Sequence, residues 1–148
     1  PYGECSEWLY ESPIPGATNP TIINGIAKDG HGMQLLAEEV QVDGILTTRT
    51  HLITAAQKVG LLGIQRLFML DSEALNTGLK MLHSAQPDAV ELLPAPILPF
   101  IADRLPHRLP PVIAGGLIDT VEELQMVLRP PVVAVSTSQM ELWTYRKE

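Results

Sequence analysis

The stretch LLGIQRLFMLDSEALNTGLKML, residues 61–82, joins a strand to a helix and decides the class of the fold. Its first part is an apolar run of strand length, and Asp71 then supplies a side chain that commonly caps a helix N-terminus. Leu75, Leu79 and Leu82 follow at spacings that place them on one face of a helix. The stretch therefore predicts one strand followed by one amphipathic helix.

The same alternation continues along the chain from about residue 28 onward. Helices are predicted between the strands, and the capping-box spacing from Thr120 to Glu123 marks the start of one of them. Strands that are apolar on both faces indicate a parallel sheet covered by helices, and right-handed crossovers bring their carboxyl ends to one edge. The five predicted strands are DGILTT (43–48), LLGIQRLFML (61–70), DAVELL (88–93), PVIAGG (111–116) and VVAVSTS (132–138).

Two α/β architectures fit this alternation, a doubly wound open sheet and a (β/α) barrel, and periodicity does not separate them. Polar side chains within the strands favour the barrel. An open sheet would cover them on both faces, whereas the upper interior of a barrel can face a solvated site. These polar residues are Thr47, Thr48, Gln65, Arg66 and Glu91.

The composition limits the class of protein. The chain has 148 residues, of which 45% are hydrophobic and 18% charged, which suits one domain with a hydrophobic core. Cys5 is the only cysteine, which excludes an internal disulfide framework and fits a reducing compartment. No apolar run reaches about 18 residues, and residues 1–13 lack the layout of a signal peptide, so we expect a cytoplasmic protein without membrane contact.

The net charge and the positions of the histidines limit which nucleic-acid and metal partners are expected. The formal net charge of -7 gives no overall attraction for the phosphate backbone of a nucleic acid. The four histidines lack metal-ligand spacing, so no metal is expected. RNA contact would need a local basic surface, and the candidates are Arg104, His107 and Arg108, with Arg129, Arg146 and Lys147.

Gly115 and Gly116 stand at the end of the fourth predicted strand, where two interpretations compete. The glycines could simply allow a tight turn with positive φ. Alternatively, they could form an anion site, because barrels often bind a phosphate between the loops after their last two strands and the start of a short final helix. Ser136, Thr137 and Ser138 close the next strand just before such a helix, and this pairing favours the phosphate site.

For the other candidate residues, structural roles are weighed against roles in binding or catalysis. Arg66 and Glu91 could form a structural ion pair across the sheet or could contact a ligand, and both interpretations remain open. Arg49 is the better ligand candidate, because a guanidinium can bind a phosphate with two hydrogen bonds. Asp71 is expected to be a helix cap. Since Glu91 is the one carboxylate expected inside the barrel and the strands contain no lysine, the sequence favours a binding protein without catalytic residues.

The chain resembles the glycerol uptake operon antiterminator regulatory family from about Ile23 to Trp143. The resemblance implies a TIM-barrel-like fold and a cytoplasmic bacterial regulator that binds glycerol 3-phosphate as its effector and leader mRNA as its partner, with no cofactor. The matching segments are DGILTTR (43–49), GLLGIQRLFMLDSEAL (60–75), DAVELLP (88–94), PVIAGGLI (111–118) and AVSTSQMELW (134–143).

The resemblance also assigns roles to individual residues. It implies that the phosphate is held by Gly115, Gly116, Thr137 and Ser138, a set to which the strand-end argument adds Ser136. It implies that the rest of the pocket is lined by Arg49, Gln65, Arg66 and Glu91.

The family's barrel has eight strands, and this chain aligns only from the end of the third strand onward. We therefore predict a partial TIM-barrel domain over residues 23–148, truncated at the N-terminus, and an unmatched, irregular leader over residues 1–22. An incomplete barrel exposes two strand edges, which soluble proteins normally cover or pair. The chain could be truncated, could form a homo-oligomer through those edges, or could be unstable alone.

Three functions remain open at this point. The first is a glycerol 3-phosphate responsive RNA-binding antiterminator that regulates glycerol uptake and metabolism genes. The second is the remnant of a barrel enzyme with a small phosphorylated substrate. The third is a nonfunctional or partner-dependent fragment. RNA binding rests on the resemblance alone.

Overall fold

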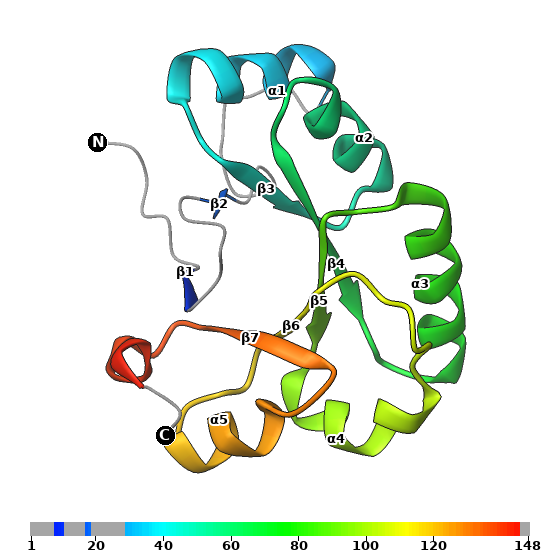
Figure 1. Ribbon diagram of the computed structural model, residues 1–148, viewed down its shortest axis with the longest axis vertical. Helices are drawn as coiled ribbons and strands as arrows, with labels where there is room; N and C mark the ends of the chain where they lie inside the picture. Colours follow the sequence, from blue (N-terminus) through cyan, green and yellow to red (C-terminus); the bar gives the residue numbers. More distant parts are fainter. Residues whose placement is uncertain (1–7, 11–16, 19–28, 146–148) are drawn as a thin grey trace.

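The computed structural model describes residues 8–10, 17–18 and 29–145. Within them, seven strands form one sheet in the order β1-β7-β6-β5-β4-β3-β2, and helices lie along its outer side (Figure 1). The strands are β1 (Trp8–Tyr10), β2 (Ala17–Thr18), β3 (Gly44–Thr47), β4 (Leu62–Phe68), β5 (Ala89–Leu93), β6 (Val112–Gly115) and β7 (Val132–Thr137). The helices are α1 (Gly30–Leu35), α2 (Thr50–Lys58), α3 (Ser72–Ala85), α4 (Leu98–Ile101) and α5 (Val121–Val127), with shorter helical turns η1 (Leu36–Val40), η2 (Ala95–Ile97), η3 (Ala102–Arg104) and η4 (Met140–Thr144).

Strands β3 to β7 form the five-stranded parallel core of the sheet. Their carboxyl ends therefore meet at one edge, which we call the carboxyl edge, and their amino ends meet at the opposite, amino edge. The sheet curves without closing, because β1 and β2 stand at the two ends of the strand order. The prediction of an incomplete barrel-type α/β fold with five strands is confirmed.

Two short strands extend this core on both sides. β1 pairs antiparallel with β7, with Trp8 opposite Thr137, and β2 pairs parallel with β3, with Ala17 opposite Gly44. Both strands fall within residues 1–22, the predicted irregular leader, and the other residues of that segment lie outside the described part of the chain. β1 and β2 supply the pairing that the exposed edges of a partial barrel need.

Two apolar layers lie on opposite faces of the sheet. The outer layer packs beneath the helices and includes Leu67 of β4 and Leu92 of β5. The inner layer contains one buried side chain from each parallel strand, as the concave interior of a barrel does. Its members are Leu46, Ile64, Ala89, Ile113 and Ala134.

Helix boundaries follow the predicted capping residues. The Asp71 carboxylate accepts the backbone N–H of Ala74 at 2.7 Å, which confirms this residue as the N-cap of α3. Thr120 and Glu123 form the reciprocal capping box of α5. Between β5 and β6, however, the helix predicted to connect the two strands is reduced to α4 and the two short turns η2 and η3. Pro96 and Pro99 lack the N–H groups that a longer helix would need there.

The cap of α3 gives a direct test of this description. Asp71→Ala leaves the N–H of Ala74 without its acceptor and should lower the free energy of unfolding by about 1 kcal/mol, measured by urea denaturation. Lys80→Ala in the exposed part of the same helix should change stability by less than about 0.5 kcal/mol. Equal effects of the two substitutions would contradict the cap.

Candidate functional site

Two loops are joined at the carboxyl edge, one after β6 and one after β7. The Thr137 hydroxyl donates to the backbone carbonyl of Ile118 at 2.7 Å, and the Gln139 amide donates to the Asp119 carboxylate at 2.9 Å. We call these two contacts the loop clasp. The Thr137 hydroxyl also accepts the backbone N–H of Gln139 at 3.1 Å. Thr137 therefore positions both loops, and its hydroxyl hydrogen is already used within the protein.

Gly115 and Gly116 are required for different reasons. A Cβ atom on Gly115 would lie 2.7 Å from Oε1 and 3.0 Å from Cδ of Glu91, so only glycine leaves room for that carboxylate. Gly116 has φ +77°, a left-handed conformation that glycine adopts readily. The exposed residue Leu117 continues with φ 57°, which is uncommon for a residue with a side chain. The glycine pair thus makes both a tight turn and a close approach to Glu91.

Glu91 and Arg66 form a buried ion pair beneath this turn. The two residues are direct neighbours in the β4–β5 register, and Arg66 Nε lies 2.5 Å from Glu91 Oε2. The Glu91 side chain is fully buried and that of Arg66 is 13% exposed. A buried carboxylate needs such a partner, because an uncompensated charge in the interior is strongly destabilising. The structural ion pair considered from the sequence is therefore present.

Strand alternation places four predicted site residues on the inner face. Arg66, Glu91, Gly115 and Ser136 each follow a member of the inner apolar layer by two residues, on the neighbouring strands β4, β5, β6 and β7. Gly115 is also the register partner of Ser136. These four residues form a polar layer immediately above the apolar one, toward the carboxyl edge.

Gln65 lies on the other face of the sheet. It is fully buried, and its amide nitrogen donates to the carbonyls of Thr47 and Arg66, both at 3.3 Å. Its Oε1 atom has no hydrogen-bond partner within the described residues. Gln65 therefore does not share a face with Arg66 and Glu91, since successive residues of a strand point to opposite sides.

Arg49 and Ser138 lie at exposed positions at the carboxyl edge. Arg49 precedes α2, and β3 is three strands away from β6 in the sheet. Ser138 directly follows β7 and is therefore next to the loop clasp. Sequence reasoning missed Gln139 and Asp119, because no spacing pattern marks a contact between two separate loops.

A side chain of α5 accepts the backbone N–H groups of the two residues that precede the helix. The Glu123 carboxylate accepts the backbone N–H groups of Asp119 at 2.8 Å and Thr120 at 3.0 Å. Because the Glu123 carboxylate carries a negative charge at the start of α5, an anion at the carboxyl edge would be favoured at the backbone of Gly115 and Gly116 and at the loop after β7.

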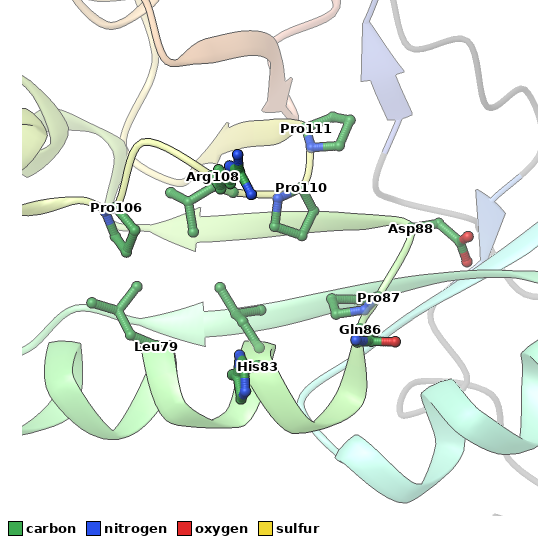
Figure 2. A pocket seen from close by; sticks show the side chains of 11 residues that line it. Leu79, His83, Gln86, Pro87, Asp88, Pro106, Arg108, Pro110 and Pro111 are labelled. Atoms are coloured by element: carbon green, nitrogen blue, oxygen red, sulfur yellow. The ribbon is translucent and has the colours of Figure 1, made fainter.

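A second concave feature lies at the amino edge, between α3 and the chain that leads into β6 (Figure 2). It is a pocket of about 430 Å³. Its lining consists of Leu79, Leu82, His83, Gln86, Pro87, Asp88, Pro106, Arg108, Leu109, Pro110 and Pro111. In the described part of the chain, no cluster of His, Cys, Asp and Glu side chains could hold a metal ion, and no helix is long and apolar enough to span a membrane.

Comparison with known proteins identifies the family. The sequence profile described as glycerol-3-phosphate responsive antiterminator matches residues 17–143. The chain belongs to this family. The resemblance predicted from the sequence is therefore confirmed, and the match includes β2 within the segment predicted as a leader.

Two solved structures agree with this assignment, and one curated relative is also similar in sequence. The glycerol uptake operon antiterminator regulatory protein of Listeria monocytogenes is 40% identical, with a TM-score of 0.74 over 84% of this chain and 68% of that protein. A glycerol uptake operon antiterminator-related protein of Thermotoga maritima is 32% identical, with a TM-score of 0.76 over 87% of this chain and 73% of that protein. The uncharacterized protein YgcP of Escherichia coli (strain K12) is 29% identical over 144 residues, 95% of this chain and 69% of YgcP.

The contact between Gly115 and Glu91 can be tested by substitution. Gly115→Ala forces the new methyl group against the Glu91 carboxylate and should lower the free energy of unfolding by about 1 to 3 kcal/mol, measured by chemical denaturation. Gly30→Ala is the matched control, because nothing lies within 4 Å of its added Cβ atom. This control should leave stability unchanged or slightly raised. A Gly115→Ala protein as stable as the control would contradict the close approach.

Proposed function

We propose that this chain is a glycerol 3-phosphate responsive, RNA-binding transcription antiterminator that acts in the cytoplasm on glycerol uptake and metabolism genes. Family membership supports the regulatory class. The observation that carries the proposal is the position of the Arg66–Glu91 pair, on the inner face directly beneath Gly115 and beside the clasped loops.

The chemistry of these groups suits a phosphorylated polyol. In this proposal the backbone of Gly115 and Gly116, together with Ser136 and Ser138, holds the phosphate. The partly exposed Arg66 guanidinium donates hydrogen bonds to the glycerol hydroxyls, and the buried Glu91 carboxylate, a pure acceptor when ionised, holds that guanidinium in place.

Arg66 makes this arrangement electrostatically favourable. A carboxylate close to a phosphate would repel it, and a paired guanidinium offsets that repulsion. Arg49, exposed at the end of β3, would supply a further positive charge at the rim.

A binding role also fits the titratable groups better than catalysis. Glu91 is held by Arg66, and strands β3 to β7 contain no lysine that could form a Schiff base or act as a proton acceptor. A remnant of a phosphate-substrate enzyme would instead turn over a triose or sugar phosphate. A homo-oligomer formed through the sheet edges stays a prediction.

Ligand-dependent stability tests the effector site. Glycerol 3-phosphate at about 100 times its Kd should add about 2.7 kcal/mol to the free energy of unfolding and raise Tm, because it binds only the folded chain. Glycerol or inorganic phosphate alone should give a smaller shift at the same concentration, since each satisfies only part of the site. A cooperative melt that glycerol 3-phosphate does not move would overturn the effector assignment. The lack of any cooperative melt would favour the partner-dependent fragment.

A charge placed at Ser138 tests where the phosphate lies. Ser138→Asp puts a carboxylate beside the proposed phosphate and should weaken glycerol 3-phosphate binding by about tenfold or more through like-charge repulsion. Ser138→Asn has nearly the same size without the charge and should bind within a few fold of wild type. Because residue 138 is exposed, both proteins should melt normally without ligand. Equal affinities in a calorimetric titration would place the phosphate elsewhere.

A further inference from the structure

The pocket at the amino edge exists because the crossover between β5 and β6 is incomplete. α3 has 14 residues, whereas α4 has only four, and the chain from residue 105 returns to β6 without a helix. Pro106, Pro110 and Pro111 keep this return segment irregular. The C-terminal half of α3 therefore faces a loop, and the space between them is the pocket in Figure 2.

The lining combines apolar walls with a few polar groups. Leucine and proline side chains account for seven of the eleven lining residues, and the other four are His83, Gln86, Asp88 and Arg108. A volume of about 430 Å³, lined by apolar and polar surface in nearly equal shares, is within the range of sites for a small organic group. The pocket is therefore large enough for one flat heterocycle with its attached sugar.

The polar groups are not equally available to a ligand. The Asp88 carboxylate already accepts the Gly63 N–H at 2.8 Å and the Gln57 amide at 3.2 Å, so its charge is used to join β5 to β4. Gln86 ends α3 in a left-handed conformation with its side chain exposed. His83 and Arg108 are also exposed and stand on opposite walls, one on α3 and one on the loop. The exposed donors of the lining are therefore Gln86, His83 and Arg108, beside leucine and proline side chains.

We propose that this pocket holds one unpaired nucleotide of an RNA. The inference rests on the RNA-binding part of the proposed function and adds its location. The base packs against the leucine and proline side chains of the lining, the Gln86 amide hydrogen-bonds to its edge, and Arg108 with His83 contacts the adjoining phosphate. Proteins commonly recognise RNA sequence in this way, through single-stranded bases that are turned out of the stack.

Charge and position both support an RNA occupant. The chain carries a net charge of -7, so a phosphate contact requires a local cation, and Arg108 supplies one at the mouth of the pocket. Arg104, in the same crossover, donates to Ser72 at the start of α3 and thus lies toward the carboxyl edge. Of the basic residues predicted as an RNA surface, Arg104 and Arg108 therefore lie at different edges, and Arg108 lines the pocket, while Arg146 and Lys147 lie outside the described part of the chain.

Selection followed by crosslinking tests the location. RNAs that bind the full chain are selected from a random 40-nucleotide library containing 4-thiouridine, with glycerol 3-phosphate present. Photocrosslinked peptides are then mapped by mass spectrometry. Crosslinks to the segments 79–88 and 106–111 are the expected result.

Matched variants test the contribution of the side chains. Arg108→Ala should weaken binding of the selected RNA by about tenfold. It should also lower the slope of log Kd against log salt by about 0.7, which corresponds to the loss of one phosphate contact to a single strand. Arg104→Ala removes the same charge at the other edge and should change affinity by less than about twofold. Gln86→Asn keeps the left-handed conformation but shortens the amide and should relax the base preference at one position.

The outcomes separate this inference from the proposed function. If no RNA is enriched although glycerol 3-phosphate raises Tm, the RNA-binding function and this inference both fail, and the effector site stands. If RNA is enriched but crosslinks lie outside the pocket, or Arg108→Ala binds like Arg104→Ala, only the pocket assignment is overturned. A free mononucleotide should compete with the RNA only weakly, and one that binds more tightly than the selected RNA would show a small-molecule site instead.

Discussion

The ion pair between Arg66 and Glu91 constrains the carboxyl half of the sheet more than any other contact. Glu91 is fully buried, and its carboxylate is compatible with that position only because a guanidinium from the adjacent strand faces it. The pairing fixes the register of β4 against β5. It also dictates the residue on the next strand, because only a glycine at position 115 leaves space for the carboxylate. One buried charge thus determines residues on three neighbouring strands.

The loops of the carboxyl edge depend on this arrangement. Gly115 ends β6 against Glu91, the turn at Gly116 redirects the chain, and the carbonyl of Ile118 then receives the Thr137 hydroxyl. The Trp143 indole donates to the carbonyl of Thr137 at 3.0 Å and so ties η4 to the end of β7. Below these contacts, the inner apolar layer closes the concave face. The polar layer therefore packs on the inner apolar layer, and the loops beside it are held by the hydrogen bonds of Thr137 and Trp143.

The sequence predicts the alternation of strands and helices well, but it predicts poorly which face of the sheet each strand residue occupies. The five parallel strands and the caps at Asp71 and Thr120 are local features, and local patterns were sufficient to find them. The sequence does not predict which face of the sheet Gln65 occupies. Both faces of β4 carry apolar residues, so the alternation along the strand does not show which face is the polar one. The loop clasp joins residues about twenty positions apart, as Gln139 and Asp119 do. Such contacts arise from tertiary packing, which spacing along one chain does not encode.

The two sites lie on opposite edges of the same strands, and this geometry limits how an effector could influence RNA. β5 spans five residues, about 16 Å, and it is fastened to β4 through Glu91 at its centre and through Asp88, which directly precedes it. An effector that contacts Arg66 therefore acts, through Glu91, on the strand that directly follows Asp88, a lining residue of the nucleotide pocket. Since coupling free energies are reciprocal, any increase in RNA affinity caused by glycerol 3-phosphate must be matched by the same factor in effector affinity when RNA is bound. The β4–β5 pair is the shared element through which that factor would be transmitted.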